Sequence, residues 1–270
     1  MRGTSRVSQE AGIEAFEPVA VAAGVDARLL ATGLFIVVDA LDSSSSLRRA
    51  LTDPARPGTD KGTLISSLFG GLDLRIQEAV EDFASRRWWH EEDLGDALED
   101  AAVEALLISA QADGSLDAVE GELFEIERLL AANLDLYSAL DNGAAIPAAR
   151  IRLAESLIGT RVSPVTKALI NRAATTTRGH RLTKNLAFYL RAAAARRNRL
   201  LARVTVAAPL SEDHRRRLES ALRAHYGRDV TLAVTVDPSI IGGVRIQVGH
   251  EIVDGTLVTR LNDARAQLVN

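Results

Sequence analysis

Apolar residues recur every three or four positions through most of the first 200 residues, which is the spacing of one helix face. In sequence rich in Ala, Leu, Glu and Arg, this pattern predicts helices over residues 28–41, 72–89, 96–111, 118–132 and 182–201. Breakers separate them, among them the serine run at 43–46 and the segment 54–58. Ser163 is an N-cap residue followed by Pro164 at the first helical position. This part of the chain is predicted to be a helical bundle.

After about residue 202 the apolar period changes from 3.6 towards 2. Ser211 is expected to cap a helix that runs to about Tyr226, with Glu212 and Asp213 in its positive first turn. Strands are predicted before and after it, followed by a closing helix: 203–208, 229–237, 244–248, 251–254 and helix 256–268. The predicted fold class is therefore α + α/β, with N-terminal helical bundle modules, partly duplicated, followed by a small β-α-β-β-β-α domain.

An internal repeat appears when the sequence is shifted by 89 positions. The shift superposes, without a gap, 47–51 on 136–140, Lys61 on Arg150, Leu64 on Leu153, Ser67 and Leu68 on Ser156 and Leu157, Gly70 on Gly159, and Ala79 on Ala168. Chance alignment of two Ala- and Leu-rich helical regions is the alternative. We favour a duplicated piece of helical module, and expect three parts: an extra N-terminal helical module over 1–92, a six-helix-type bundle over 93–201, and an α/β domain over 202–270.

The composition is that of an ordinary globular chain, with 47% hydrophobic and 25% charged residues. Cysteine is absent, which excludes disulfides, thiolate zinc sites, iron–sulfur clusters and a cysteine nucleophile. No apolar run approaches the roughly 20 residues that cross a bilayer, and residues 1–26 lack the apolar core of a signal peptide. We expect a cytosolic chain without direct membrane insertion.

The net charge of -4 conceals two opposed segments. Residues 78–127 hold 16 Asp and Glu against 2 Arg, whereas residues 148–228 hold 18 Arg and Lys against 4 acids. Such segments either pair with each other, steer different partners, or form solvated helix faces. Nucleic-acid binding is disfavoured, because the basic residues of 191–203 alternate with Ala and Leu and have only Phe188 and Tyr189 as stacking platforms.

The sequence contains few candidates for catalytic or metal-binding residues. The five histidines are dispersed, and no pair of them lies at metal-ligand spacing beside a carboxylate. The glycine pairs at 70–71 and 242–243 lack the residues of a phosphate loop. Trp88 and Trp89 are expected in core or intermodule packing rather than in a ligand cage. We therefore expect no catalytic residue, no metal site and no cofactor, which favours an interaction or scaffold role.

The C-terminal part carries the most specific motif. An apolar strand leads to Asp237, Gly242–Gly243 forms a turn before Val244–Val248, and Gly249 precedes Ile252-Val253-Asp254-Gly255-Thr256. This pattern closely resembles the signature of the ATP synthase delta subunit, the oligomycin-sensitivity-conferring protein family. The resemblance extends back over about residues 95–270, and the additional residues 1–92 resemble the lengthened subunit of actinobacteria.

The resemblance implies a non-catalytic subunit of the F-type ATP synthase, one copy per complex, on the cytoplasmic face of the plasma membrane. The family links the catalytic head to the membrane-anchored b subunit in the peripheral stalk and resists rotor torque. By resemblance, a groove for the N-terminal helices of the alpha subunits is lined by Leu106, Ser109, Ala110, Val165, Leu169 and Arg172. The b subunit is expected to contact Val244, Ile246, Val248, Leu257, Leu261 and Leu268. For each of these residues, core packing is the alternative.

The resemblance assigns no role to residues 1–92. Our hypothesis is that this module packs along the b subunit or a second copy of the stalk, with Trp88 and Trp89 in its docking surface. Two other classes of function compete with the stalk subunit: a free-standing helical adaptor or nucleic-acid-binding regulator that uses the basic stretch 191–228, and an enzyme with a dispersed active site.

Overall fold

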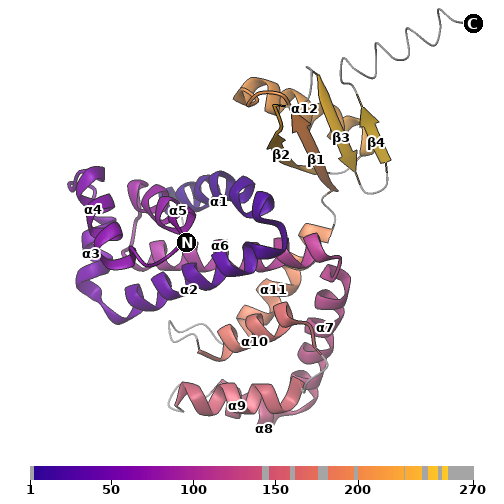
Figure 1. The fold of residues 1–270 in the computed structure, drawn as a ribbon. Helices are drawn as coiled ribbons and strands as arrows, with labels where there is room; N and C mark the ends of the chain where they lie inside the picture. The colour runs from indigo at the N-terminus through magenta and orange to yellow at the C-terminus, as the bar shows by residue number, and fades with distance from the viewer. Residues whose placement is uncertain are drawn as a thin grey trace, which may run out of the picture. The chain divides into compact units, whose positions relative to one another are not determined.

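The computed structural model describes residues 3–141, 146–158, 162–175, 182–197, 200–227, 229–238, 243–248 and 251–254. The chain divides into two compact units, residues 1–196 and residues 197–270. The first unit is helical and the second contains a four-stranded sheet (Figure 1). The predicted fold class is confirmed for these residues, and the predicted closing helix over 256–268 lies outside them. The predicted boundary at residue 92 falls inside the first unit and stays a prediction.

The first unit is a series of helices with one short 3-10 turn, η1. Their bounds are α1 Thr4–Ala23, η1 Gly24–Asp26, α2 Ala27–Ser43, α3 Ser45–Thr52, α4 Gly58–Phe69, α5 Leu74–Ser85, α6 Glu92–Asp113, α7 Leu116–Ala132, α8 Leu134–Leu140, α9 Pro147–Ile158, α10 Pro164–Thr175 and α11 Leu182–Arg197.

The helices predicted from periodicity are present with small shifts at their ends. Ser163 accepts a hydrogen bond from the Thr166 backbone N–H at 3.0 Å, which is the expected N-cap of α10. The prediction for the end of α11 was wrong: Leu200 and Leu201 belong to a strand, because they pair in a ladder with Val230 and Thr231.

The helix bounds support the predicted repeat and extend it over five helices. Shifted by 89 positions, α2 and α4 coincide with α7 and α9 at both ends, and α1, α3 and α5 coincide with α6, α8 and α10 to within one residue. We call α1–α5 the first repeat and α6–α10 the second repeat. The buried cation Lys61 on α4 has its counterpart in the buried Arg150 on α9. One five-helix plan therefore occurs twice in this unit.

The packing of the helices repeats as well. In the first repeat, α1 packs on α2 and α5, α2 on α3 and α5, and α4 on α5. The corresponding pairs in the second repeat, α6 on α7 and α10, α7 on α8 and α10, and α9 on α10, are all present. Recurrence of both bounds and contacts argues against chance alignment of two helical regions.

Helix α6 is shared between the two repeats. It packs against α1, α2, α3 and α5 of the first repeat as well as α7 and α10 of the second. Shifted by the same 89 positions, α6 overlaps α11, so α11 follows the second repeat in the chain as α6 follows α1–α5. Because it has neighbours on every side, α6 is buried along almost its whole length and consists largely of Ala and Leu.

The segment Thr4–Ser43 is long and apolar enough to cross a membrane by length and composition alone, with a mean hydropathy of 1.8 over an 18-residue window that is 44% buried. The expectation that no apolar run approaches this length was therefore too strict. Within the molecule η1 interrupts the segment, and α2 packs along α6 with Leu30, Leu34 and Val38 fully buried. The inner face of α2 is thus part of the helical core.

The second unit holds β1 Leu200–Val206, α12 Glu212–Tyr226, β2 Val230–Val236, β3 Val244–Val248 and β4 Glu251–Asp254. The strand order is β2-β1-β3-β4, with β1 parallel to β2 and antiparallel to β3, and with β4 antiparallel to β3. Parallel pairing of β1 and β2 requires a crossover, and α12 provides it. Ser211 caps α12 by accepting from the His214 N–H at 3.3 Å, as predicted.

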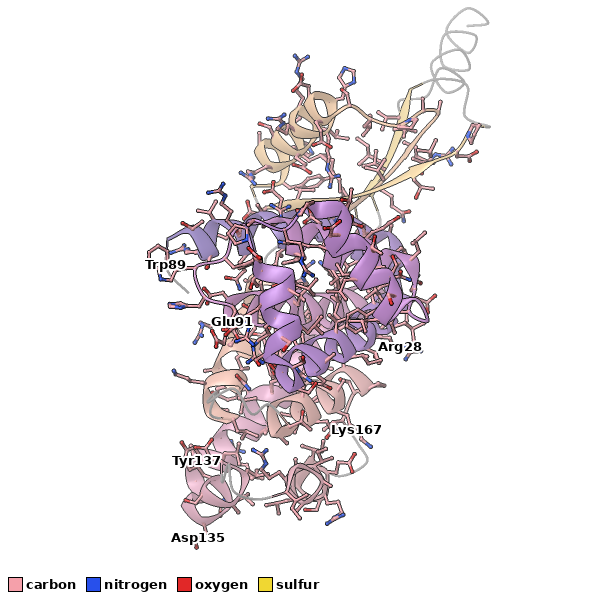
Figure 2. The ribbon with its side chains drawn as sticks, turned by 90° about the vertical axis from the view of Figure 1, so that its left-hand side faces the viewer. Arg28, Trp89, Glu91, Asp135, Tyr137 and Lys167 are labelled. Atoms are coloured by element: carbon pink, nitrogen blue, oxygen red, sulfur yellow. The ribbon has the colours of Figure 1, made fainter. Side chains whose placement is uncertain are left out.

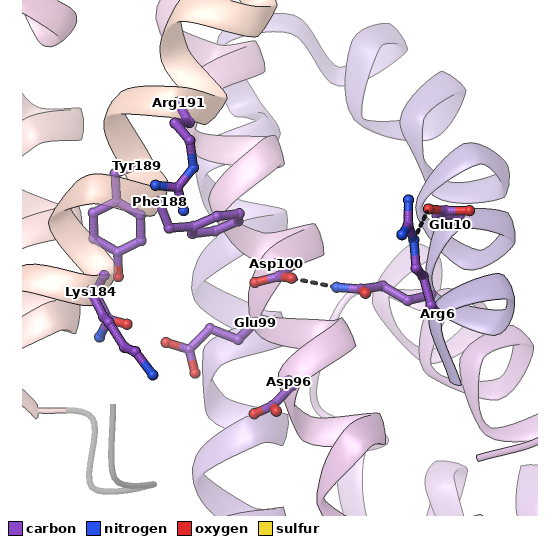
Figure 3. Close-up of a pocket in the computed structure, with 11 residues that line it drawn as sticks. Arg6, Glu10, Asp96, Glu99, Asp100, Lys184, Phe188, Tyr189 and Arg191 are labelled. Carbon is purple, nitrogen blue, oxygen red and sulfur yellow. Dashed lines mark hydrogen bonds and ion pairs between the residues drawn. The ribbon is translucent and has the colours of Figure 1, made fainter. Parts of the chain in front are cut away.

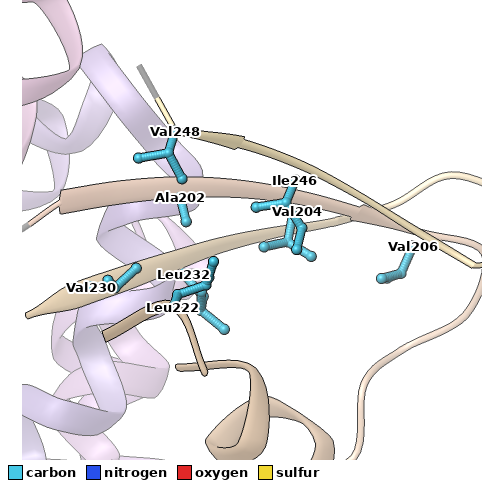
Figure 4. Packing of buried hydrophobic residues seen from close by; sticks show 8 residues of the cluster. All are labelled: Ala202, Val204, Val206, Leu222, Val230, Leu232, Ile246 and Val248. Carbon is cyan, nitrogen blue, oxygen red and sulfur yellow. The ribbon is translucent and has the colours of Figure 1, made fainter. Parts of the chain in front are cut away.

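One face of this sheet forms the core of the second unit (Figure 4). Its buried residues alternate along the strands and pack with Leu222 of α12: Ala202, Val204, Val206, Val230, Leu232, Ile246 and Val248. Gly227 ends α12 with φ of 66°, a left-handed conformation that glycine adopts without strain.

Candidate functional site

The six residues predicted to line a partner groove lie on α6 and α10, which pack together. All six are buried: Leu106, Ser109, Ala110, Val165, Leu169 and Arg172. The Ser109 hydroxyl donates to the backbone oxygen of Val25 at 2.7 Å, so η1 lies directly against α6 here. The structure thus places the six residues on two helices that pack together, which we call the α6–α10 seam, and Ser109 lies against η1 of the first repeat.

Arg172 joins three helices at this seam. Its guanidinium donates to Asp39 on α2 at 2.6 Å and to Glu99 on α6 at 3.2 Å, although it belongs to α10. It also lies over the ring of Phe35, 4.6 Å from the centroid. Sequence periodicity alone did not reveal the role of α2, because the partners of Arg172 lie 73 and 133 positions away.

Arg196 makes a second buried junction, on α11. Its guanidinium contacts Glu17 of α1 at 2.7 Å and Glu104 of α6 at 2.9 Å, and it donates to Gln111 at 3.3 Å. Only 2% of the Arg196 side chain is exposed. Arg172 and Arg196 come from the basic segment of the chain, and Glu99 and Glu104 from the acidic one. The two opposed segments therefore pair at least in part with each other.

The second repeat is further fixed by Glu122 of α7. Its carboxylate accepts from the Ser163 backbone N–H at 3.0 Å and from the Thr166 hydroxyl at 2.5 Å, both at the start of α10. At the matching place in the first repeat, Gly33 of α2 lies against Ile76 of α5. The same helix contact is thus polar in the second repeat and apolar in the first.

A cavity of about 440 Å³ lies among α1, α6 and α11 (Figure 3). Its lining mixes both charges: Arg6, Gln9, Glu10, Asp96, Glu99, Asp100, Lys184, Asn185, Phe188, Tyr189 and Arg191. Burial, followed by the charge of Asp96, raises the pKa of Asp100 to about 7, while the hydrogen bond from Gln9 opposes the shift. No histidine, serine or threonine is among these lining residues, so the lining offers no aliphatic hydroxyl nucleophile and no imidazole base.

The part of the chain that the structure describes offers few other candidates for metal-binding or catalytic groups. There, no group of three or more His, Asp or Glu side chains is placed to hold a metal ion. His90, His214 and His225 are exposed, as surface histidines are expected to be, while His180 and His250 lie outside the described residues.

The two tryptophans differ from each other. Trp88 is half-buried and donates its indole N–H to the Phe83 backbone oxygen at 2.9 Å. The prediction of core or intermodule packing was wrong for Trp89, whose side chain is 72% exposed within this unit, because the chain leaves α5 at Ser85 and runs over the surface (Figure 2).

The residues predicted to contact the b subunit divide into two groups. Ile246 and Val248 on β3 are buried in the core of the second unit, and Val244 packs at its margin. Leu257, Leu261 and Leu268 lie outside the described residues. Core packing therefore accounts for the burial of the two central β3 side chains, and contact with a partner stays a prediction for the set.

Comparison with known proteins gives one consistent family. The model of the ATP synthase delta (OSCP) subunit matches residues 103–268. The "ATP synthase subunit delta" of Beutenbergia cavernae is 43% identical over 272 residues, with 99% of each chain covered. Those of Streptomyces avermitilis and Streptomyces coelicolor are 40% and 39% identical and cover 99% and 100% of this chain, and 98% and 99% of their own. These relatives match the first repeat as well as the part covered by the family model.

Proposed function

Because the chain belongs to the ATP synthase delta (OSCP) subunit family, as its sequence signature predicted, we propose that it is the linker of the peripheral stalk that joins the catalytic head to the b subunit. The full-length match to proteins named ATP synthase subunit delta carries this proposal. The subunit is structural rather than catalytic, and it works as part of a membrane-associated ATP synthase complex. We further propose that it lies on the cytoplasmic face of that membrane, in one copy per complex.

The mechanism requires a linker that resists torque, so that rotor movement changes the catalytic sites instead of turning the whole head. The described helical unit has features suited to this task. Buried charged junctions at Arg172 and Arg196 tie α10 and α11 to helices of the first repeat. Such contacts hold helices in one arrangement, because breaking a buried ion pair leaves a charge without its partner.

We propose that the alpha subunits contribute helices to the helical unit and that the b subunit binds the second unit. Helix-in-groove recognition, with apolar side chains at i, i+3 and i+4, suits a surface built from packed helices. The α6–α10 seam remains our proposed location for an alpha-subunit helix, with Leu106 and Leu169 in its floor. Since the seam residues are buried, such a helix would lie above them rather than replace them.

The proposal is tested by reconstitution with purified components. Tagged chain is mixed with the synthase head and, separately, with the soluble part of the b subunit from the same organism, and each mixture is run on a sizing column at moderate salt. Co-elution with both supports the linker role. Failure to co-elute with the head or with the b subunit would overturn the linker proposal. Binding to nucleic acid that weakens steeply with salt would also overturn it, and would favour the hypothesis of a free-standing adaptor or nucleic-acid-binding regulator.

A further inference from the structure

Helix α2 presents a row of side chains to solvent that the helical core does not use. Leu29, Thr32 and Ile36 of α2, with Val25 of the preceding η1, form this outer row, and Leu29 and Ile36 are 60% and 48% exposed. The opposite face of the helix is fully buried, at Leu30, Leu34, Val37, Val38 and Leu41. α2 is therefore apolar on both sides, although one side alone completes the core.

The spacing of the outer row identifies the kind of surface it fits. Successive members are separated by 4, 3 and 4 positions, which is the spacing of the narrow seam between two coiled helices. At about 1.5 Å per residue, the row is roughly 16 Å long, or three helical turns. A lipid surface would call for a wider apolar face flanked by Lys and Arg. The charged residues beside this row are instead mixed, with one cation, Arg28, and two acids, Asp26 and Asp39.

The repeat supplies an internal control for the outer row. At the matching positions the second repeat has Gly114, Ala118, Gly121 and Glu125. Since α7 has the same bounds as α2 after the shift, this helix forms and packs with Ala118 as the one apolar residue among these four positions. Folding of the five-helix plan thus does not require the row, and its apolar character calls for another explanation.

We propose that the outer row of α2 is the docking seam for one amphipathic helix of another subunit. That helix carries apolar residues at matching spacing and a carboxylate that faces Arg28. The Arg28 side chain is exposed, and within the described residues it makes no hydrogen bond or ion pair (Figure 2). The inference rests on the proposed function for the assembly that supplies the helix, and it gives the first repeat a role in binding.

The test replaces outer-row residues of α2 with the residues found at the matching positions of α7. The double variant Leu29→Ala, Ile36→Glu places the residues of α7 on α2, so the helix is expected to fold normally. Leu68→Glu is the matched control, because Leu68 is 53% exposed on α4 and lies outside the row. Binding of each chain to detergent-solubilised ATP synthase stripped of this subunit is measured by biolayer interferometry, with circular dichroism to verify helix content.

We expect the double variant to bind at least tenfold more weakly and the control to bind as the unaltered chain does. Arg28→Glu should weaken binding severalfold, and less so at high salt. Equal binding by the double variant and the unaltered chain would overturn the docking seam while leaving the proposed function standing. No binding by the unaltered chain would overturn the proposed function and the seam with it. Loss of binding to anionic vesicles in the double variant, with synthase binding intact, would assign the row to lipid and also refute the inference.

Discussion

Replacing Arg196 with Met is expected to destabilise the helical unit strongly. The change keeps the length and much of the volume of the side chain but removes its contacts with Glu17 and Glu104, at 2.7 and 2.9 Å. Breaking a buried ion pair by removing one partner costs about 3–5 kcal/mol. Both carboxylates retain about a fifth of their exposure, so water partly replaces the lost partner. We therefore expect a loss of about 2–4 kcal/mol.

The assay is urea unfolding followed by tryptophan fluorescence. The chain contains 2 Trp, and both lie in the first unit, so the signal reports this unit alone. A loss of about 3 kcal/mol also corresponds to a fall in Tm of about 6–12 °C for a unit of this size. Arg191→Met is the control, because Arg191 is exposed on the same helix, and it should change stability by less than about 0.5 kcal/mol.

The reasoning on Arg196 would be refuted by a loss under about 1 kcal/mol, since the guanidinium would then contribute no more than a surface ion pair. A double-mutant cycle sharpens the test. In the Arg196→Met background, Glu104→Gln should restore part of the stability, because it removes a carboxylate left without its cation. If the two changes were simply additive, the contact between the two side chains would not be the source of the loss.

Four further substitutions, two of them a matched pair of glycine variants, test other parts of the fold. Asp100→Asn should make the free energy of unfolding less dependent on pH. The native pKa of Asp100, about 7, exceeds the usual 3.8, so the folded state binds the proton more tightly than the unfolded state does. In the unaltered chain, stability therefore falls as pH rises from about 4 to about 7. Because Asp100 is half-buried, we expect a gain of about 1–2 kcal/mol at pH 8 in urea unfolding, and parallel pH curves would contradict this. Gly12→Ala should lower the free energy of unfolding by about 1–3 kcal/mol, because the new Cβ would meet the buried Phe83 ring at 2.6 Å. Gly121→Ala, with open space around it, should raise the free energy of unfolding by up to about 1 kcal/mol. Similar changes in both variants would refute the packing argument. Ser211→Ala removes the α12 cap and should cost about 1 kcal/mol, seen as faster amide hydrogen exchange in that helix; unchanged exchange would show that the cap is dispensable.

Local sequence signals predicted the elements whose cause is local. Alternating Val230, Leu232 and Val234 marked β2, and Ser211 marked the start of α12. Helix α1 was not singled out, since Pro18 lies inside it and weakens the helical signal. The end of α11 was also misjudged, because Leu200 and Leu201 have good helix propensity but gain ladder hydrogen bonds with β2 that propensity does not describe.

The candidate site was less predictable because its contacts join distant parts of the chain. Resemblance to the family brought Ser109 and Arg172 to one seam, yet it gave no indication that Asp39 of α2 would pair with that arginine. The repeat could not have indicated it either, because the register of 89 positions aligns α2 with α7 and α5 with α10, whereas α2 and α10 belong to different repeats. Followed along whole helices, the register shows instead which positions differ between the two repeats.

The sharing of α6 between the repeats also sets the order in which the chain can fold during synthesis. Residues 4–85 contain α1–α5, but their core is closed only when α6 leaves the ribosome. From that moment the first repeat has the helix that closes its core, and α6 is already held in place when α7–α11 emerge. The contacts of Arg172 on α10 and Arg196 on α11 with the first repeat are added later. The second repeat then assembles on a finished template, so a ribosome stalled near residue 150 should display a protease-resistant N-terminal fragment that includes α6.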